Sequence, residues 1–278
     1  MNGRDLCEAL HAGRRVYGTC ITAPSPRWPG VVKGLGLDFV FIDTEHVAQD
    51  REKLSWMCGA YRALGIAPVV RIPAPDPYQA CMVFDGGAEG VIAPYVETAA
   101  QVRALAGAAK LRPLKGKRLY GRLDGSAGLE PELEGYLAER NAGSVLIVNI
   151  ESAPALAALD EILAVPGLDA VLIGPHDLTC SLGIPEQYQH PRFDEAVRSI
   201  VRKARARGVG AGIHYWLGTE QEIAWARDGL NLLIHSTDSV LFANALRADL
   251  ATLKDALGDS ASRDGERMSA TVTPCKVV

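Results

Sequence analysis

Several signatures of common enzyme classes are missing from this sequence of 278 residues. It has no C-x-x-C pair, no G-x-x-x-x-G-K-[ST] loop, and no G-x-G-x-x-G after a candidate strand. A P-loop and a dinucleotide-binding crossover are therefore not expected. No glycine-rich cup for phosphate follows the last two candidate strands either.

An excess of positive charge is also missing. The net charge is −4, and the lysines and arginines are scattered, so we expect neither nucleic acid nor a membrane as a partner. The first 15 residues lack the apolar core and cleavage site of a signal peptide, and no window approaches the ~20 apolar residues of a membrane span. These features favour a cytoplasmic location.

Cysteine is sparse and shows no disulfide framework. The spacing of the six cysteines favours reduced thiols that fill the core, which agrees with a reducing compartment. They are Cys7, Cys20, Cys58, Cys81, Cys180 and Cys275.

Apolar runs and helix-like segments alternate along the chain. The strands are predicted at 16–21, 39–43, 68–72, 91–94, 145–150, 170–174, 210–214 and 231–235. The helices are predicted at 28–34, 51–64, 77–84, 99–110, 153–163, 193–207, 219–227 and 239–257. This alternation predicts an α/β fold, a (β/α)8 TIM barrel formed by residues 1–257 as one catalytic domain. Residues 258–278 read as a disordered tail.

Lysine is absent from the predicted strand ends. All eight lysines fall in helices, in the tail, or in the long excursion between residues 111 and 143, which we expect to serve as a lid or a subunit contact. A Schiff-base aldolase needs a lysine at a strand end, so carbonyl activation is expected from a metal ion instead.

Two predicted strands end in carboxylates. Glu151 closes the fifth strand and Asp177 follows the sixth, and the carboxyl ends of barrel strands carry the chemistry in this fold. We expect these oxygens to hold a divalent cation, with helix capping as the alternative. Asn149 should lie on the same face as Glu151, and the backbone from Gly174 to Asp177 should bind a substrate carboxylate.

Charged residues also follow the second and third strands. The run Asp43-Thr44-Glu45-His46 offers His46 as a general base held by a carboxylate, unless Asp43 only caps the next helix. Arg71 either binds a substrate anion or forms a structural ion pair with Asp43 or Glu45.

The seventh strand ends in His214-Tyr215-Trp216. His214 and Trp216 should line the pocket for the variable half of the substrate. Packing in an aromatic core is the alternative for Trp216.

In combination these motifs resemble the HpcH/HpaI aldolase family. The resemblance covers about residues 5–257, and it is carried by four motifs: 41–46, 68–71, 149–152 and 173–178. It implies a metal-dependent (β/α)8 barrel that cleaves a 4-hydroxy-2-oxo acid, through a metal-stabilised enolate, into pyruvate and an aldehyde, as 4-hydroxy-2-oxoheptanedioate aldolase does.

The resemblance also implies roles for single residues. Glu151 and Asp177 would bind Mg²⁺, Mn²⁺ or Co²⁺, His46 would transfer a proton, and Arg71 would stabilise the enolate. Asp85 would support the histidine of a neighbouring subunit in a homohexamer built as a trimer of dimers. The substrate-binding set would comprise Arg71, Asn149, Gly174, Pro175, His176, Asp177, His214 and Trp216.

Two departures from the family pattern concern the aldehyde half of the substrate. Asn149 stands where the best-known members have Gln, and the family's G-x-R-G loop reads Gly116-Lys117-Arg118-Leu119.

Three other functions remain open at this stage. An oxaloacetate decarboxylase or a macrophomate synthase-like enzyme would use the same enolate. A CoA-ester lyase of the citrate lyase β type would need Lys115, Lys117 and Arg118 as its nucleotide groove. The third is a barrel that only binds a metabolite.

Overall fold

The computed structural model describes residues 1–259, and in it eight parallel strands close into a barrel in the order β1 to β8. The predicted (β/α)8 fold is therefore confirmed. The strands are β1 (Val16–Ile21), β2 (Phe39–Asp43), β3 (Ala67–Arg71), β4 (Gly90–Ala93), β5 (Val145–Ile150), β6 (Ala170–Ile173), β7 (Gly210–Tyr215) and β8 (Leu232–Thr237).

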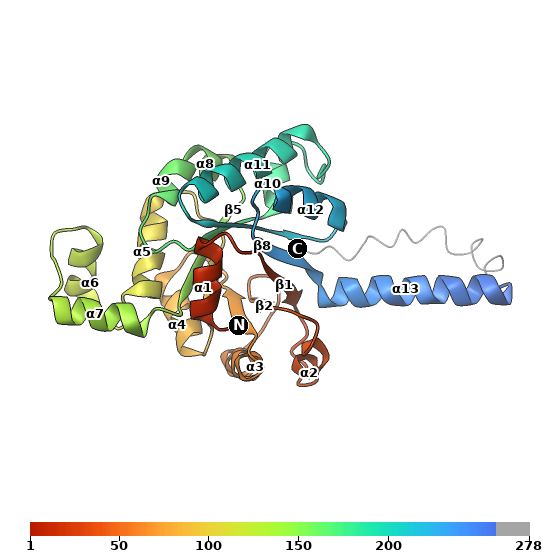
Figure 1. Cartoon of the computed structure of the whole chain (residues 1–278), viewed down its shortest axis with the longest axis horizontal. Coiled ribbons are helices and arrows are strands. Elements are labelled where there is room, and N and C mark those ends of the chain that lie inside the picture. The colour runs from red at the N-terminus through yellow and green to blue at the C-terminus, as the bar shows by residue number, and fades with distance from the viewer. Residues whose placement is uncertain (260–278) are drawn as a thin grey trace.

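Helices follow the strands and form the outer layer (Figure 1). They are α1 (Gly3–His11), α2 (Trp28–Val32), α3 (Arg51–Ala63), α4 (Pro77–Asp85), α5 (Ala99–Lys110), α6 (Gly116–Leu123), α7 (Pro131–Arg140), α8 (Ala153–Ala157), α9 (Leu159–Leu163), α10 (Pro175–Ser181), α11 (Pro191–Ala206), α12 (Thr219–Arg227) and α13 (Asp238–Leu257). The single helix predicted over 153–163 is wrong, because the chain leaves helical geometry at Ala158.

Side chains of the strands alternate between two apolar layers. One set, including Val40, Ile42 and Val70, packs against the helices, and the other, including Phe39 and Val69, fills the barrel. Helix α1, which the sequence did not predict, adds Leu6 and Leu10 to the inner cluster, and both are fully buried. Because α1 precedes β1, it closes the amino-terminal end of the barrel.

The excursion contains α6 and α7, which are linked by ion pairs from Arg118 to Glu130 and from Arg122 to Glu134. It connects α5 to β5, so it lies on the amino-terminal side of the barrel, where Gly143 contacts Gly3 of α1. A lid over the carboxyl-terminal ends of the strands is therefore wrong for this segment. The subunit contact stays a prediction.

Helix α13 extends away from the barrel (Figure 1). It ends at Leu257, and Gly258 follows in the left-handed conformation with φ 76°. The predicted disordered tail falls almost wholly on residues 260–278, which lie outside the described residues. Within residues 1–259, no helix is long and apolar enough to cross a membrane.

Candidate functional site

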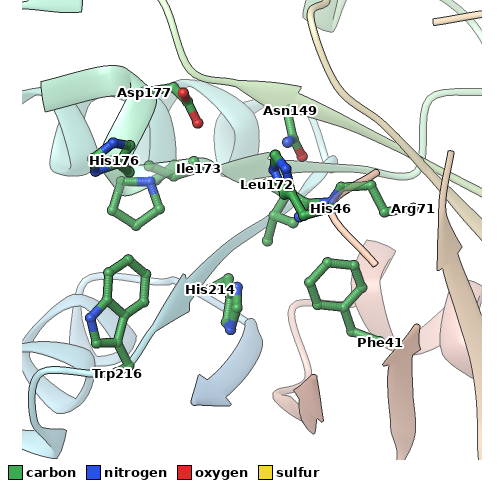
Figure 2. Close-up of a pocket in the computed structure, with 12 residues that line it drawn as sticks. Phe41, His46, Arg71, Asn149, Leu172, Ile173, His176, Asp177, His214 and Trp216 are labelled. Carbon is green, nitrogen blue, oxygen red and sulfur yellow. The ribbon is translucent and has the colours of Figure 1, made fainter. Parts of the chain in front are cut away.

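A pocket opens at the carboxyl-terminal end of the barrel (Figure 2). It collects most of the residues that the sequence singled out, from loops and strand ends far apart in the chain. They are His46, Arg71, Asn149, Gly174, Pro175, His176, Asp177, His214 and Trp216, and Phe41, Leu172 and Ile173 complete the wall. Figure 2 shows Asp177 and Asn149 on the side of the pocket opposite Trp216 and His214.

The carboxylates of Glu151 and Asp177 converge on the same point. A Cβ atom placed on Gly174 would lie 2.8 Å from Glu151 Oε2 and 3.8 Å from Asp177 Oδ2. Any side chain at position 174 would therefore fill the space between the two acids, which explains why glycine stands there. Oxygens gathered in this way suit a hard divalent cation.

Hydrogen bonds fix the orientation of Glu151. The backbone amide of Tyr95 donates to Oε1 at 2.6 Å, and Asn149 Nδ2 donates to Oε2 at 2.8 Å. Helix capping, the alternative for Glu151, is wrong because Ser152 caps α8 through the amide of Ala155. In α10 the N-cap residue is Gly174, so Asp177 is free to face the pocket from the first turn.

The electrostatics of this site indicate unbalanced negative charge. Burial raises the pKa of Glu151, and the charges of Asp177 and Glu45 raise it further, against the two hydrogen bonds. Asn149 Oδ1 is also buried without a hydrogen-bond partner among the described residues. The carboxylates of Glu151 and Asp177, with an unsatisfied amide oxygen next to Glu151, fit a bound cation, which would compensate the charge.

Arg71 is an ion-pair partner and a pocket residue at once. Its Nε donates to Asp43 Oδ1 at 2.9 Å and its Nη2 to Oδ2 at 2.8 Å, while Glu45 Oε2 lies 3.1 Å from Nε. Burial acts to raise the pKa of Asp43, but the bonds and the charge of Arg71 hold it below its usual value. Two of the five N–H groups of Arg71 serve Asp43, so others can meet a substrate oxygen.

Both alternatives for Arg71 are thus compatible with its position, because the structural ion pair exists and the side chain still lines the pocket. The guanidinium also lies over the ring of Phe41, with Cζ 5.2 Å from the ring centre. This contact keeps the group in place at the wall.

The carboxylate nearest to His46 is that of Glu45, in the run that the sequence singled out. His46 Nε2 lies 3.6 Å from Glu45 Oε2, whereas both oxygens of Asp43 bond to Arg71. Capping of the next helix by Asp43 is wrong, because Asp50 caps α3. The His46 side chain is 28% exposed and reaches the pocket, so it can exchange a proton with a bound molecule.

The opposite wall is aromatic. Trp216 makes edge contacts with His214 and with Tyr188, with ring centres 5.8 and 5.7 Å apart, so it both lines the pocket and packs in an aromatic cluster. His214 Nε2 lies 3.1 Å from the carbonyl oxygen of Ser236. Burial lowers the pKa of His214 to about 4, so the ring is neutral near pH 7.

Asp85 does not join the pocket of its own chain. It ends α4, its side chain is 78% exposed, and it lies 3.6 Å from Arg112 Nη1. This position is compatible with the expected contact to a neighbouring subunit, which stays a prediction.

Sequence reasoning missed Tyr95, and it gave no site role to Tyr188. Tyr95 follows β4 with a positive φ of 55° and is 56% exposed. Its interaction with Glu45, burial, and the charges of Glu151 and Asp177 raise the pKa of Tyr95 to about 12. A polar residue after the fourth strand was the available signal. The hydroxyl of Tyr188 lies 3.3 Å from His176 Nδ1.

Comparison with known proteins places this arrangement in a family. The family profile described as HpcH/HpaI aldolase/citrate lyase matches residues 21–245. The 2-keto-3-deoxy-L-rhamnonate aldolase of Shigella sonnei strain Ss046 is 32% identical over 249 residues, which cover 89% of this chain and 92% of that protein. The same values hold for the protein of that name from Escherichia coli strain K12.

Solved structures agree with this placement. A crystal structure of an HpcH/HpaI aldolase from Desulfitobacterium hafniense DCB-2 is 29% identical, with a TM-score of 0.77 and coverage of 90% of this chain and 96% of that one. The citrate synthase SbnG is 31% identical, with a TM-score of 0.76 and coverage of 90% and 97%. The chain therefore belongs to the HpcH/HpaI aldolase/citrate lyase family, as its motifs predicted, and is an enzyme of the carbon–carbon lyase class.

Proposed function

We propose that this enzyme is a divalent-metal-dependent aldolase that cleaves 4-hydroxy-2-oxo acids between C3 and C4 into pyruvate and an aldehyde, or forms them. The observation that carries the proposal is the convergence of Glu151 and Asp177 on the empty side of Gly174, in a pocket that also presents His46 and Arg71. The relatives named 2-keto-3-deoxy-L-rhamnonate aldolase support it, because that compound is itself a 4-hydroxy-2-oxo acid.

Glu151 and Asp177 would hold the cation, and Asn149 would orient Glu151 from beneath. Their oxygens suit Mg²⁺, Mn²⁺ or Co²⁺. When bound, such an ion supplies Lewis acidity that polarises the keto group of the substrate. The backbone amides in the first turn of α10, from His176 onward, lie beside the same pocket and would bind the substrate carboxylate.

His46 would accept the proton of the C4 hydroxyl, directly or through a water molecule. The C4–O bond then becomes the carbonyl of the aldehyde, and the electrons of the C3–C4 bond move into the enolate of pyruvate. Arg71 would donate a free N–H to the enolate oxygen, since Asp43 already fixes the plane of its guanidinium. A proton returned to C3 completes pyruvate.

The aldehyde portion would lie against His214 and Trp216. Neutral His214 and the aromatic edge offer a surface of mixed polarity, which suits a short hydroxylated aldehyde better than a charged one. For 2-keto-3-deoxy-L-rhamnonate, cleavage between C3 and C4 yields lactaldehyde beside pyruvate. We therefore propose this sugar acid as the first substrate to test.

The test compares wild type with Glu151→Gln in the direction of cleavage. Pyruvate release should require added Mg²⁺ or Mn²⁺, should stop with EDTA, and should fall to background in the variant. Metal-independent turnover, or an active Glu151→Gln, would refute the proposal. Parallel assays with oxaloacetate separate the alternative of a decarboxylase or macrophomate synthase-like enzyme, which would release CO₂ faster than it cleaves the sugar acid.

The CoA-ester lyase has less support. Lys115, Lys117 and Arg118 belong to the excursion, on the amino-terminal side of the barrel, away from the pocket. They therefore offer no nucleotide groove next to Glu151. A barrel that only binds a metabolite would show metal and ligand binding without turnover in the same assay.

We further propose that the protein is a homo-oligomer, a hexamer built as a trimer of dimers. In α13 only Asp238 is buried, although the helix carries large apolar residues on one stripe. The exposed residues are Leu241, Phe242, Leu246, Leu250, Leu253 and Leu257. A second copy of this chain is the partner that would cover such a stripe. Replacing Leu246 and Leu250 together by Glu should lower the mass measured by light scattering.

The same assembly would bring Asp85 of one subunit to His46 of another. Mixing His46→Ala with Asp85→Ala tests this, because each variant should be nearly inactive alone and the exchanged hexamer should regain part of the activity. No recovery after verified subunit exchange would refute the shared site. The single barrel domain of residues 1–257 and the cytoplasmic location stay predictions.

A further inference from the structure

A second cluster of ligand-type side chains lies at the amino-terminal end of the barrel, opposite the pocket. Cys7 and His11 occupy adjacent turns of α1, and Asp169 immediately precedes β6. Their sulfur, nitrogen and oxygen atoms all lie within 4.8 Å of one another. Residues four apart on a helix face the same side, so α1 presents both groups to Asp169 together.

The distances from Asp169 Oδ1 to the other two groups are close to those between neighbouring ligand atoms of a metal ion. Asp169 Oδ1 lies 3.2 Å from Cys7 Sγ and 3.0 Å from His11 Nε2. A tetrahedral zinc ion with bonds of about 2.0–2.3 Å separates its ligand atoms by roughly 3.3–3.8 Å. The two pairs that share Asp169 Oδ1 therefore need to move apart by only a few tenths of an ångström to admit an ion, and Cys7 Sγ and His11 Nε2 already lie within 4.8 Å of each other.

Asp169 can bind a metal ion through one oxygen while the other oxygen keeps its ion pair with Lys110. Its Oδ2 accepts hydrogen bonds from Lys110 Nζ at 2.6 Å and from the amide of Leu146 at 2.7 Å, whereas Oδ1 faces Cys7 and His11. The Asp169 side chain is 4% exposed and that of His11 is 48% exposed, so the cluster is buried at Asp169 and reaches solvent at His11. Solvent can supply the fourth ligand and the route of entry.

From this geometry we infer that Cys7, His11 and Asp169 form a binding site for a transition-metal ion of the Zn²⁺ type, separate from the oxygen-ligand site of the pocket. Thiolate and imidazole ligands select such ions over Mg²⁺. Binding replaces the thiol proton of Cys7, which passes to solvent, and joins α1 to β6. The ion fastens the helix that closes the barrel.

The first test is the absorption of Co²⁺, added to the full-length protein in the presence of excess Mg²⁺ that occupies the pocket. A cobalt–thiolate centre gives a charge-transfer band, whereas cobalt bound by oxygen ligands in the pocket gives none. We expect one such centre per chain in wild type and in Cys81→Ala, the matched control for a half-buried cysteine elsewhere. The band should be lost in Cys7→Ala.

The second test uses stability and covers the case in which Cys7→Ala folds poorly. With Mg²⁺ in excess, Zn²⁺ at 100 times its Kd should raise Tm by roughly 5–10 °C in wild type. In His11→Gln, whose fold is verified by circular dichroism, Zn²⁺ should bind at least tenfold more weakly. Absence of the cobalt band in wild type, or an unchanged band in Cys7→Ala, would overturn the inference, as would equal Zn²⁺ affinity in His11→Gln.

Discussion

Each end of the barrel buries a carboxylate, and the surroundings of the two carboxylates shift their pKa values in opposite directions. Glu151 at the carboxyl-terminal end is 7% exposed, and Asp169 at the amino-terminal end is 3% exposed. Glu151 accepts bonds from neutral groups and lies near Asp177 and Glu45, so its pKa is raised, first by burial. Burial also acts to raise the pKa of Asp169, but His11 and Lys110 hold it below its usual value.

The difference separates two uses of a buried acid. Lys110 balances the charge of Asp169 within the chain, and the result is a fastening between α5, α1 and β6. Glu151 lacks a cationic neighbour of this kind among the contacts of the described residues. Its charge is therefore left to be balanced by a ligand, at a cost in stability that functional sites commonly carry.

The largest expected effect is on activity. Replacing the buried acid should reduce activity strongly at the carboxyl-terminal end and hardly at all at the amino-terminal end. Glu151→Gln should lower kcat/KM by about 10³-fold or more, because it removes a charged ligand from the site that stabilises the transition state. Asp169→Asn, the matched change at the other end, should leave kcat/KM close to that of wild type. Steady-state assays with saturating Mg²⁺ measure both. A large loss in Asp169→Asn would mean that the ends are coupled.

Stability should respond in the opposite order. Asp169→Asn should lower the free energy of unfolding by about 3 kcal/mol, because it leaves the half-buried ammonium group of Lys110 without its counter-charge. Glu151→Gln should raise the free energy of unfolding of the metal-free protein by about 1 kcal/mol, because it removes a disfavoured charge. Urea unfolding in EDTA gives both values. Equal signs for the two variants would contradict the comparison.

Lowering the pH should reduce the free energy of unfolding in two separate ranges, one set by His214 in the pocket and one by Asp169 at the opposite end. The pKa of His214 is lowered to about 4 by burial, so the unfolded chain, with a histidine pKa near 6.5, binds the extra proton between these values. The free energy of unfolding should fall by about 3 kcal/mol as pH falls from about 6.5 to about 4. The pKa of Asp169 lies below 3.8, so its contribution persists above pH 3.8 and is lost only at lower pH.

Urea midpoints measured in steps from pH 7 to pH 3 test this separation. His214→Gln should flatten the curve above pH 4 and leave the lower step in place. Asp169→Asn should do the reverse. A His214→Gln variant with the slope of wild type would contradict the role given to His214.

The smallest effect concerns a hydroxyl at the edge of the pocket. Tyr95→Phe should lower kcat/KM about fivefold, because it removes an interaction of the hydroxyl with Glu45 worth about 1 kcal/mol, while the bond from the Tyr95 amide to Glu151 remains. Tyr17→Phe, at the start of β1, is the control with similar exposure and should change nothing. An unchanged Tyr95→Phe would remove Tyr95 from the site.

The strands and their order could be predicted because a parallel strand buried on both faces is an apolar run. The fully buried residues of β5 illustrate this. Helix α1 was missed because its segment of nine residues mixes charged residues with only four buried ones. Helix α10 was missed because it is short and Pro175 directly follows the predicted strand, although proline at the first position suits a helix.

The contents of the pocket could also be predicted, because residues at the carboxyl ends of barrel strands meet in one place. An ion pair of Arg71 with Asp43 or Glu45 is among the alternatives that the sequence offers, but the two hydrogen bonds from Arg71 to Asp43 could not be predicted. The choice of Asp43 as the partner of Arg71 depends on register, since these two residues are direct neighbours across β2 and β3. Tyr95 is positioned by a positive φ, which a tyrosine in the sequence does not indicate.

Helix α1 restricts how substrates and products can enter and leave the pocket. Leu6 and Leu10 are fully buried in the inner cluster, so among residues 1–259 the amino-terminal end of the barrel is filled by apolar side chains. Substrate and products would enter and leave through the mouth of the pocket at the carboxyl-terminal end of the barrel. The product bound deeper in the pocket would then leave after the outer product. Release is thereby ordered by the architecture, and the outer product is the one that should inhibit by blocking the way.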